Sequence, residues 1–292
     1  MSESSTEEED DIPDMSSLPC SSMNLMLHGA VFAESLPMSS ERVISIDGWL
    51  QLISGSFYIP KESDNKPLGG DAHFICADEQ TIGVADGVGG WAKKGIDSGE
   101  YARLLVSNLI FAIKCEPYDS VDPKKVLNLA YSNTKAQGSS TACIVTLKEK
   151  RLCAVNIGDS GFIVIRKEKK IYRSPIQQRH FNCPYQLGNS PGCDRPHSAQ
   201  VLNFPVEAGD AIVVGTDGLF DNLFDLEIVE EVNKGIRDGL DPNEVAYIIA
   251  GIAWLRSYDN QPTPFAKQAK MAGKHCSGGK KDDISVIVAY IR

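Results

Sequence analysis

Apolar residues in this chain form two kinds of pattern between residue 43 and the C-terminal end. Short apolar runs rich in Val, Ile, Phe and Tyr, bounded by turn-forming residues, predict β-strands. Only a few residues separate many of these runs, which favours hairpins and antiparallel pairing. The expected strands span residues 43–46, 52–59, 72–77, 81–85, 141–147, 151–157, 161–166, 170–173, 210–215 and 284–290.

Apolar residues at helical spacing predict helices, each starting at a capping residue. An aspartate or serine accepts hydrogen bonds from the first turn, and a proline suits the first helical position. The expected helices begin at Asp97 or Ser98, at Asp122 followed by Pro123, at Asp225, and at Asp241 followed by Pro242. Pairs of helices alternating with hairpin strands predict an α+β sandwich, with sheets inside and helices outside.

Residues 1–40 differ in composition from the rest of the chain. They are rich in Ser, Glu, Asp and Pro and poor in aromatic residues, so we expect a disordered acidic N-terminal arm. No internal repeat or long linker divides residues 41–292, which we expect to form one catalytic domain. The first residues are acidic, whereas targeting peptides begin with basic residues, so we predict a cytoplasmic or nuclear location, with an organelle as the alternative.

Charge and composition exclude several classes of protein. A net charge of -10 without a basic stripe argues against a nucleic-acid partner. No run of about 18 apolar residues is present, so no membrane span is expected. Eight cysteines without a C-x-x-C pair predict free thiols in place of a disulfide framework or zinc site. No feature of the sequence sets the oligomeric state, and a monomer is the default expectation.

Acidic residues stand at the ends of strongly apolar predicted strands. Asp71 precedes one strand, Asp86 ends the next, Asp217 follows the strand at 210–215, and Asp282 with Asp283 precedes the last. If these strand ends meet, several carboxylates converge, and their mutual repulsion favours the binding of cations. Oxygen ligands suit Mg²⁺ or Mn²⁺, and no His/Cys set typical of zinc lies nearby in the sequence.

The glycines after Asp86 fit the same interpretation. Gly87 has no side chain, so its carbonyl can approach an ion closely. An Asp-Gly pair also marks an ordinary hairpin turn, and one such pair alone favours that simpler explanation. The recurrence of the pattern at four strand ends favours a ligand site.

Six motifs in a fixed order carry a family resemblance: "GGDAHF", "VADGVGG", "GSSTACIV", "NIGDSGF", "GTDGLFDN" and "KKDDISVIV". Over residues 50–292 the chain resembles the metal-dependent serine/threonine protein phosphatases of type 2C. "GVADGVGGW", "GDSGFIVIR" and "YRSPIQQRHFNCPYQL" are similar to the branch of mitochondrial-type and plant phosphatases related to the bacterial sporulation phosphatase. The resemblance implies a four-layer sandwich, in which two central, mostly antiparallel β-sheets are flanked by pairs of antiparallel helices.

The resemblance also implies a site with two Mg²⁺ or Mn²⁺ ions. Asp86 would bridge the two ions, and the carbonyl of Gly87 would bind the second. Asp217 and Asp282 would hold the first ion, and Asp71 would support the second through water. The catalytic residues would then be Asp86, Asp217 and Asp282.

Two further acids, Asp159 and Asp221, match positions that the family associates with a third, weaker ion. Asp283 stands where the family usually has Asn. The implied reaction is the direct, in-line attack of water on a phosphoserine or phosphothreonine of a protein substrate, because two divalent ions activate water and stabilise the developing charge.

Two departures from the family pattern concern how phosphate is held and released. Val88 replaces the usual histidine, so the expected proton donor for the leaving group is absent from that position. No arginine matches the usual phosphate-binding residue, and Lys66 is the nearest cation before Asp71, although a solvated loop lysine explains it equally well. His180 in "QQRHFNCPYQL" is a candidate for the substrate entrance, whereas His73 is expected to be a partnered structural histidine.

Two other functions compete with the phosphatase as interpretations of these motifs. A haloacid-dehalogenase type of site needs an aspartate two residues before the motif acid, but Val84 and Gly215 occupy those positions. A catalytically weak or inactive metal-binding scaffold that interacts with phosphoproteins remains an alternative, because Val88 removes an expected catalytic group. The presence of all the core acids favours the enzyme.

Overall fold

The structure is a computed structural model that describes residues 49–61, 68–117 and 119–292. The acidic arm predicted at 1–40, the strand predicted at 43–46 and Lys66 lie outside these residues.

Two five-stranded antiparallel sheets form the centre of the molecule. The first sheet has the order β1 (Leu52–Ile59), β14 (Ile284–Ile291), β13 (Ala211–Gly215), β7 (Gly161–Arg166) and β8 (Lys169–Arg173). The second has the order β12 (Gln200–Pro205), β6 (Arg151–Ile157), β5 (Ala142–Lys148), β3 (Thr81–Asp86) and β2 (Asp71–Cys76). The hairpins β2–β3, β5–β6 and β7–β8 confirm the antiparallel pairing expected from the short gaps between strands.

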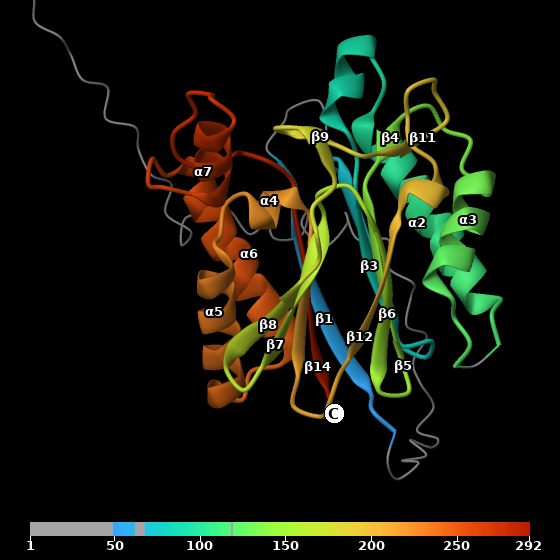
Figure 1. Ribbon diagram of the computed structural model, residues 1–292, viewed down its shortest axis with the longest axis vertical. Coiled ribbons are helices and arrows are strands. Elements are labelled where there is room, and N and C mark those ends of the chain that lie inside the picture. The colour runs from blue at the N-terminus through green and yellow to red at the C-terminus, as the bar shows by residue number, and fades with distance from the viewer. Residues whose placement is uncertain (1–48, 62–67, 118) are drawn as a thin grey trace, which may run out of the picture.

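Helices cover the outer face of each sheet (Figure 1). Helices α2 (Ser98–Lys114) and α3 (Pro123–Asn133) pack on the second sheet, and α5 (Asp225–Asp238) and α6 (Pro242–Tyr258) pack on the first. The four-layer α+β sandwich is therefore confirmed. Among the described residues, no helix combines the length and apolarity that a membrane crossing requires.

Shorter elements complete the chain. They are the 3-10 helices η2 (Gly89–Lys94) and η3 (Pro196–Ser198), the helices α4 (Asp217–Phe220) and α7 (Pro264–Met271), and the strands β4 (Ser139–Ser140), β9 (Gln178–His180), β10 (Cys183–Pro184) and β11 (Leu187–Gly188).

Three apolar layers hold the sandwich together, one between the two sheets and one under each pair of helices. All residues of β13 are buried, with Val213 packed toward the helices and Val214 toward the other sheet. Successive side chains of a strand point to opposite faces. A strand covered on both sides must therefore be apolar at every position, which explains its uninterrupted apolar run.

All four helix starts were predicted correctly, and only the capping role expected of Asp225 requires correction. Asp97, Asp122 and Asp241 are N-caps whose carboxylates accept hydrogen bonds from backbone N–H groups of the first turn. The N-cap of α5 is Phe224, and Asp225 is the first helical residue. The carboxylate of Asp225 instead binds Lys170 and Arg173 of β8, at 2.7 Å each, and so ties α5 to the edge of the first sheet.

Candidate active site

The acidic strand ends meet between the two sheets. Asp71 begins β2 and Asp86 ends β3, and the two residues lie directly opposite each other in the antiparallel register. In the first sheet, Asp217 follows β13 at the start of α4, and Asp282 lies two residues before β14. Burial and the nearby carboxylates of Asp217, Asp71 and Asp282 raise the pKa of Asp86 well above its ordinary value. Residues from both sheets thus form one electrostatic cluster.

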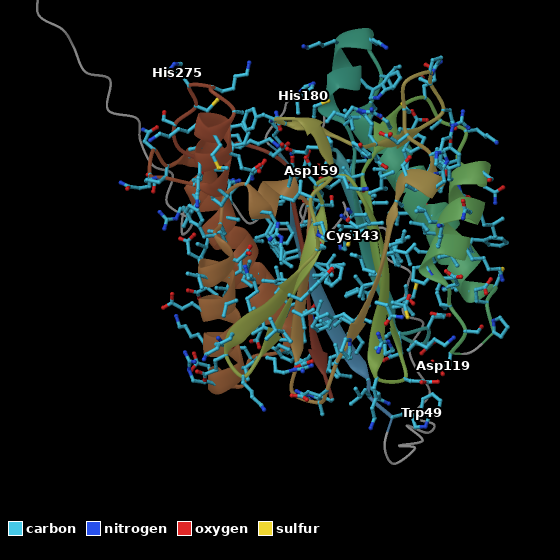
Figure 2. The ribbon with its side chains drawn as sticks, in the orientation of Figure 1. Trp49, Asp119, Cys143, Asp159, His180 and His275 are labelled. Carbon is cyan, nitrogen blue, oxygen red and sulfur yellow. The ribbon has the colours of Figure 1, made fainter. Side chains whose placement is uncertain are left out.

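A further acid comes from the turn between β6 and β7. Asp159 lies near the upper ends of the sheets in the view of Figure 2. One carboxylate oxygen each of Asp86, Asp159 and Asp217 lie within 4.8 Å of one another. This spacing lets a single small cation contact all three carboxylates.

Three buried carboxylate oxygens of the cluster have no hydrogen-bond partner among the described residues. They are Oδ1 of Asp71, Asp159 and Asp217, whose side chains belong to residues only 1%, 4% and 8% exposed. A buried carboxylate oxygen without a partner is costly. Divalent cations would satisfy all three oxygens, so the donor set fits Mg²⁺ or Mn²⁺.

The other oxygen of each of these carboxylates is held by a neighbouring side chain. Oδ2 of Asp71 accepts hydrogen bonds from the hydroxyls of Thr216 and Ser285, both at 2.8 Å. Oδ2 of Asp159 accepts one from the amide of Gln178, also at 2.8 Å. Such outer contacts fix the orientation of metal-binding carboxylates.

Burial and mutual repulsion raise the pKa values of several acids in the cluster. Burial, together with the nearby charge of Asp283, raises the pKa of Asp71 well above its ordinary value. Burial also raises the pKa of Asp159 to about 7, assisted by Asp217, and that of Asp221 to about 7, although Lys280 opposes the latter shift. Protons or cations must therefore neutralise part of the cluster near neutral pH.

Close packing explains the glycine after Asp86. The backbone N–H of Gly87 donates to the carbonyl of Gly70 at 3.1 Å, and a Cβ at Gly87 would overlap the carbonyl oxygen of Ser98. Only a residue without a side chain lets the end of β3 approach the start of α2 this closely.

Lys280 is a member of the cluster that the sequence analysis missed. Its ammonium contacts Asp217 and lies 3.0 Å from both Asp221 and Asp282. Burial acts to lower the pKa of Lys280, but the three carboxylates outweigh burial and hold the pKa well above its ordinary value. The ammonium therefore remains positively charged and links Asp221 and Asp282 to Asp217.

Lys61 is a second cation that the sequence analysis missed. Its Nζ lies 3.7 Å from Oδ1 of Asp282, and its side chain is half exposed. The backbone N–H of Lys61 donates a hydrogen bond to Oδ1 of Asp283. The Tyr58 hydroxyl donates to the same oxygen at 2.9 Å. Asp283 thus ties the end of β1 to the start of β14.

The predicted histidines lie outside the cluster. His180 is exposed on β9, where its Nδ1 is 3.2 Å from the carbonyl of Phe181, and Gln178 on the same strand is the residue that reaches Asp159. His73 is buried beside the Ser56 hydroxyl at 3.2 Å, which agrees with the structural role expected for it. Val88 is half buried and offers no proton.

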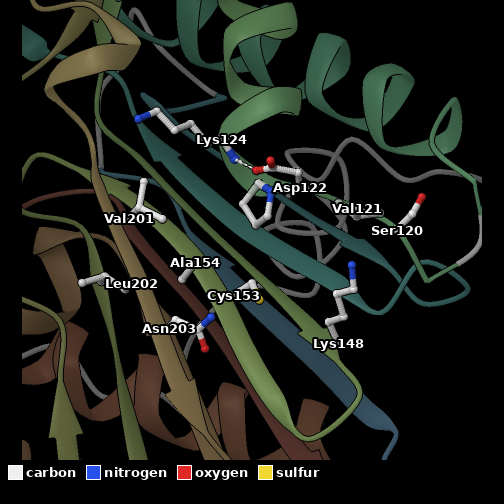
Figure 3. Close-up of a pocket in the computed structure, with 11 residues that line it drawn as sticks. Ser120, Val121, Asp122, Lys124, Lys148, Cys153, Ala154, Val201, Leu202 and Asn203 are labelled. Carbon is white, nitrogen blue, oxygen red and sulfur yellow. Dashed lines mark hydrogen bonds between the residues drawn. The ribbon is translucent and has the colours of Figure 1, made fainter.

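A cavity of about 280 Å³ lies elsewhere, between the start of α3 and strands β6 and β12 (Figure 3). Its lining includes Asp122, Lys124, Lys148, Cys153 and Val201, and none of the clustered acids. The clustered acids therefore lie apart from this cavity.

Comparisons with known proteins agree with this arrangement. The family model of protein phosphatase 2C matches residues 63–248. "Probable protein phosphatase 2C 55" of Arabidopsis thaliana is 51% identical over 243 residues, covering 83% of this chain and 52% of that protein. "Protein phosphatase PTC7 homolog" of Danio rerio is 36% identical over 264 residues, covering 82% and 89% of the two chains. The chain spans only 52% and 59% of the Arabidopsis phosphatases 2C 55 and 80.

Solved structures show the same fold. The photosystem II phosphatase PBCP superposes with a TM-score of 0.76 at 32% identity, covering 82% of this chain and 99% of that one. The catalytic domain of the phosphatase PstP, solved in complex with two manganese ions, has a TM-score of 0.57 at 18% identity and covers 83% and 99%. Together with the family model and the sequence relatives, these matches show that the chain belongs to the protein phosphatase 2C family.

Proposed function

We propose that this chain is a metal-dependent protein serine/threonine phosphatase that hydrolyses phosphoserine and phosphothreonine. The observation that carries the proposal is the group of Asp86, Asp159 and Asp217, whose carboxylate oxygens lie within 4.8 Å of one another. Buried Oδ1 oxygens of Asp159, Asp217 and the nearby Asp71 have no partner among the described residues. A buried set of oxygen ligands of this kind is the site that a hard divalent cation prefers. Membership of the protein phosphatase 2C family supplies the reaction.

The cofactors in this proposal are two Mg²⁺ or Mn²⁺ ions, and the PstP structure supports that number because it contains two manganese ions. Asp86, the carbonyl of Gly87, Asp217 and Asp282 would hold the ions, and Asp71 would support the site. When bound, such ions activate water and stabilise charge on the attacking and leaving oxygens.

The chain's own residues orient the ligands and the substrate. Thr216 and Ser285 fix the carboxylate of Asp71, and Gln178 fixes that of Asp159. Lys61, half exposed beside Asp282, is placed to attract the substrate phosphate as a point charge.

The remaining predictions about substrate and context belong to the same proposal. Phosphoproteins are the partners, the chain acts as a monomer without nucleic acid, and its location is cytoplasmic or nuclear. Val88 supplies no proton, so the leaving oxygen would take its proton from water. A slow reaction is the expected consequence.

Turnover of a chromogenic aryl phosphate and a phosphothreonine peptide tests the proposal. We expect hydrolysis with Mn²⁺ and none with excess EDTA. Asp217→Asn should reduce kcat/KM by about 100-fold or more, because it removes a ligand charge from the site. Asp78→Asn is the matched control, since Asp78 is exposed in the turn between β2 and β3.

The scaffold alternative predicts no turnover. A scaffold would bind Mn²⁺ and the phosphopeptide without turnover above the uncatalysed rate. Equal rates for the unaltered chain and Asp217→Asn would therefore reject the enzyme assignment, whereas normal activity in EDTA would reject the metal site.

A further inference from the structure

The cavity between the start of α3 and strands β6 and β12 lies outside the proposed metal centre (Figure 3). Its apolar lining comes from Val121, Ala154, Val201 and Leu202. Val201 is 60% exposed. An occupant that covered this lining would remove apolar surface from water, which favours binding.

Two lysines also line the cavity, Lys124 of α3 and Lys148 of β5. Neither ammonium has an ion-pair partner within the described ranges, whereas the neighbouring Lys125 pairs with Glu116 at 2.7 Å. Asp122 is the acidic residue of the lining, and its carboxylate already caps α3. The cavity therefore offers an apolar surface together with two unpaired cations, which suits an acidic occupant.

The edge of the second sheet indicates that the occupant is a polypeptide segment. Strand β12 is the outer strand of this sheet, and among the described residues its hydrogen-bonded neighbour is β6 alone. Three residues of β12, Val201, Leu202 and Asn203, belong to the lining. An outer strand of this kind can pair with an extended segment through backbone hydrogen bonds.

The N-terminal part of this chain contains a segment of matching chemistry. Residues 1–48 hold ten acidic residues and one basic residue, Arg42, and so carry nearly all of the net charge of -10. Five consecutive acids occupy residues 7–11, and Ile12 and Met15 follow closely. Residues 7–15, "EEEDDIPDM", are called the acidic segment here. This segment combines the negative charge and the apolar side chains that suit the cavity.

The described chain enters the molecule beside the cavity. The N–H of Leu52 at the start of β1 donates to Oε1 of Gln80 at 2.5 Å, and the N–H of Leu147 donates to the carbonyl of Gln80 at 2.9 Å. Lys148, which lines the cavity, directly follows Leu147. The residues that connect the acidic segment to β1 therefore join the sandwich close to one border of the cavity.

We propose that the acidic segment docks in this cavity, with its two apolar side chains on the apolar lining and its carboxylates beside Lys124 and Lys148. The residues between Met15 and Trp49 can span roughly 110 Å when extended, so their length permits the contact. Covalent tethering raises the local concentration of the segment to about the millimolar range, so a weak site is sufficient. The cavity includes none of the clustered acids, so the inference is independent of the proposed phosphatase activity.

Carbodiimide cross-linking of the whole chain tests this contact, because the reagent joins a lysine amine to a carboxylate that lies against it. Peptide mass spectrometry should find Lys124 and Lys148 joined to acids of the acidic segment. An equal mixture of unlabelled and ¹⁵N-labelled chain distinguishes docking within a chain, which gives no mixed links, from docking between two copies. Mixed links as frequent as unmixed ones would overturn the proposal. So would links no more frequent than those to the exposed Lys267 and Lys270 of α7.

Lysine variants measure how strongly the cavity holds the segment. Lys124→Gln/Lys148→Gln removes two charges from positions that are not buried, so the fold should be retained. Cleavage at residues 7–9 by a glutamate-specific protease should become about 5-fold faster in this double variant, because two ion pairs are lost. Lys267→Gln/Lys270→Gln is the matched control and should be cleaved at the rate of the unaltered chain. Equal cleavage rates in the two double variants would overturn docking at Lys124 and Lys148.

Discussion

At the scale of single residues, three carboxylates of the cluster, those of Asp71, Asp159 and Asp217, have one oxygen held by a neighbouring side chain and the other buried without a partner among the described residues. Asp71 shows the division clearly: one oxygen accepts hydrogen bonds from Thr216 and Ser285, and the other is buried without a partner among the described residues. The two hydroxyl donors to one oxygen fix the orientation of the Asp71 carboxylate. Residues that never touch an ion can therefore decide how tightly it binds.

Thr216→Val tests this positioning role. The valine keeps the shape but removes the donor to Asp71, so the affinity for Mn²⁺ should fall by about 10-fold to 100-fold. A Mn²⁺ titration followed by calorimetry measures the change. Thr146→Val is the control, because the Thr146 hydroxyl is also buried but pairs with Thr81 inside the second sheet. An equal loss of affinity in both variants would show that the effect is general destabilisation.

The acids of the cluster could be predicted from the sequence, but the side chains that pair with them could not. Asp71, Asp86, Asp217 and Asp282 could be identified because each follows or precedes an apolar run. Lys280 carries no such signal, since its contacts reach α4 across the fold and depend on a hydrogen bond from its N–H to Asn222. A lysine two residues before a clustered acid is a hint that becomes meaningful only with tertiary contacts.

At the scale of elements, the turn after β3 joins the site to the start of α2. Gly87 lies against the carbonyls of Gly70 and Ser98, so the strand end, the helix start and the loop before β2 share one crowded contact. The position of Asp86 therefore depends on packing as well as on strand pairing.

Gly87→Ala should lower the free energy of unfolding by about 1–3 kcal/mol, because the added Cβ overlaps the carbonyl of Ser98 and backbone must shift. Urea denaturation measures the loss. Gly89→Ala is a close control, since a Cβ there meets nothing within 4 Å. Equal free energies of unfolding for Gly87→Ala and Gly89→Ala would contradict the packing argument.

Strands that are buried on both faces and helices that begin with a strong N-cap could be predicted from the sequence. The long strands and α2, α3 and α6 belong to this group. Strand β12 was missed because only one face is covered: Leu202 and Phe204 are half buried while Val201 and Asn203 are exposed, and Pro205 interrupts the pattern. Helix α7 was missed because Ala269 is its only buried residue, which leaves no apolar stripe to detect.

At the scale of the whole molecule, the site exists only while both sheets are packed together. Asp86 belongs to the second sheet and Asp217 to the segment after β13 of the first, so the ions of the proposed centre would join the two halves. A ligand that binds only the folded chain stabilises it by mass action. Stability and metal binding should therefore depend on pH together.

The sign of this dependence follows from the raised pKa values. Burial, with Asp217 assisting, raises the pKa of Asp159 to about 7, and burial raises that of Asp221 to about 7 against the opposing charge of Lys280. The metal-free folded state therefore holds protons that the unfolded chain has released above about pH 4. The raised pKa values of these two carboxylates therefore stabilise the metal-free folded state fully below about pH 4. This stabilisation is lost as the pH rises through about 7.

The gain in unfolding temperature caused by Mn²⁺ should therefore grow between about pH 5.5 and pH 7.5, because protons compete with the ions for the same carboxylates at the lower pH. One pKa unit corresponds to about 1.4 kcal/mol, so an increase of roughly 3 °C or more is expected for a chain of this size. Differential scanning calorimetry with Mn²⁺ and with EDTA at each pH measures the increase.

Burial lowers the pKa of His73 to about 4, which destabilises the fold at the acidic pH, but this effect is common to both conditions and cancels in the difference. Asp217→Asn should abolish most of the Mn²⁺ effect, and an equal gain at both pH values would contradict proton competition at these carboxylates.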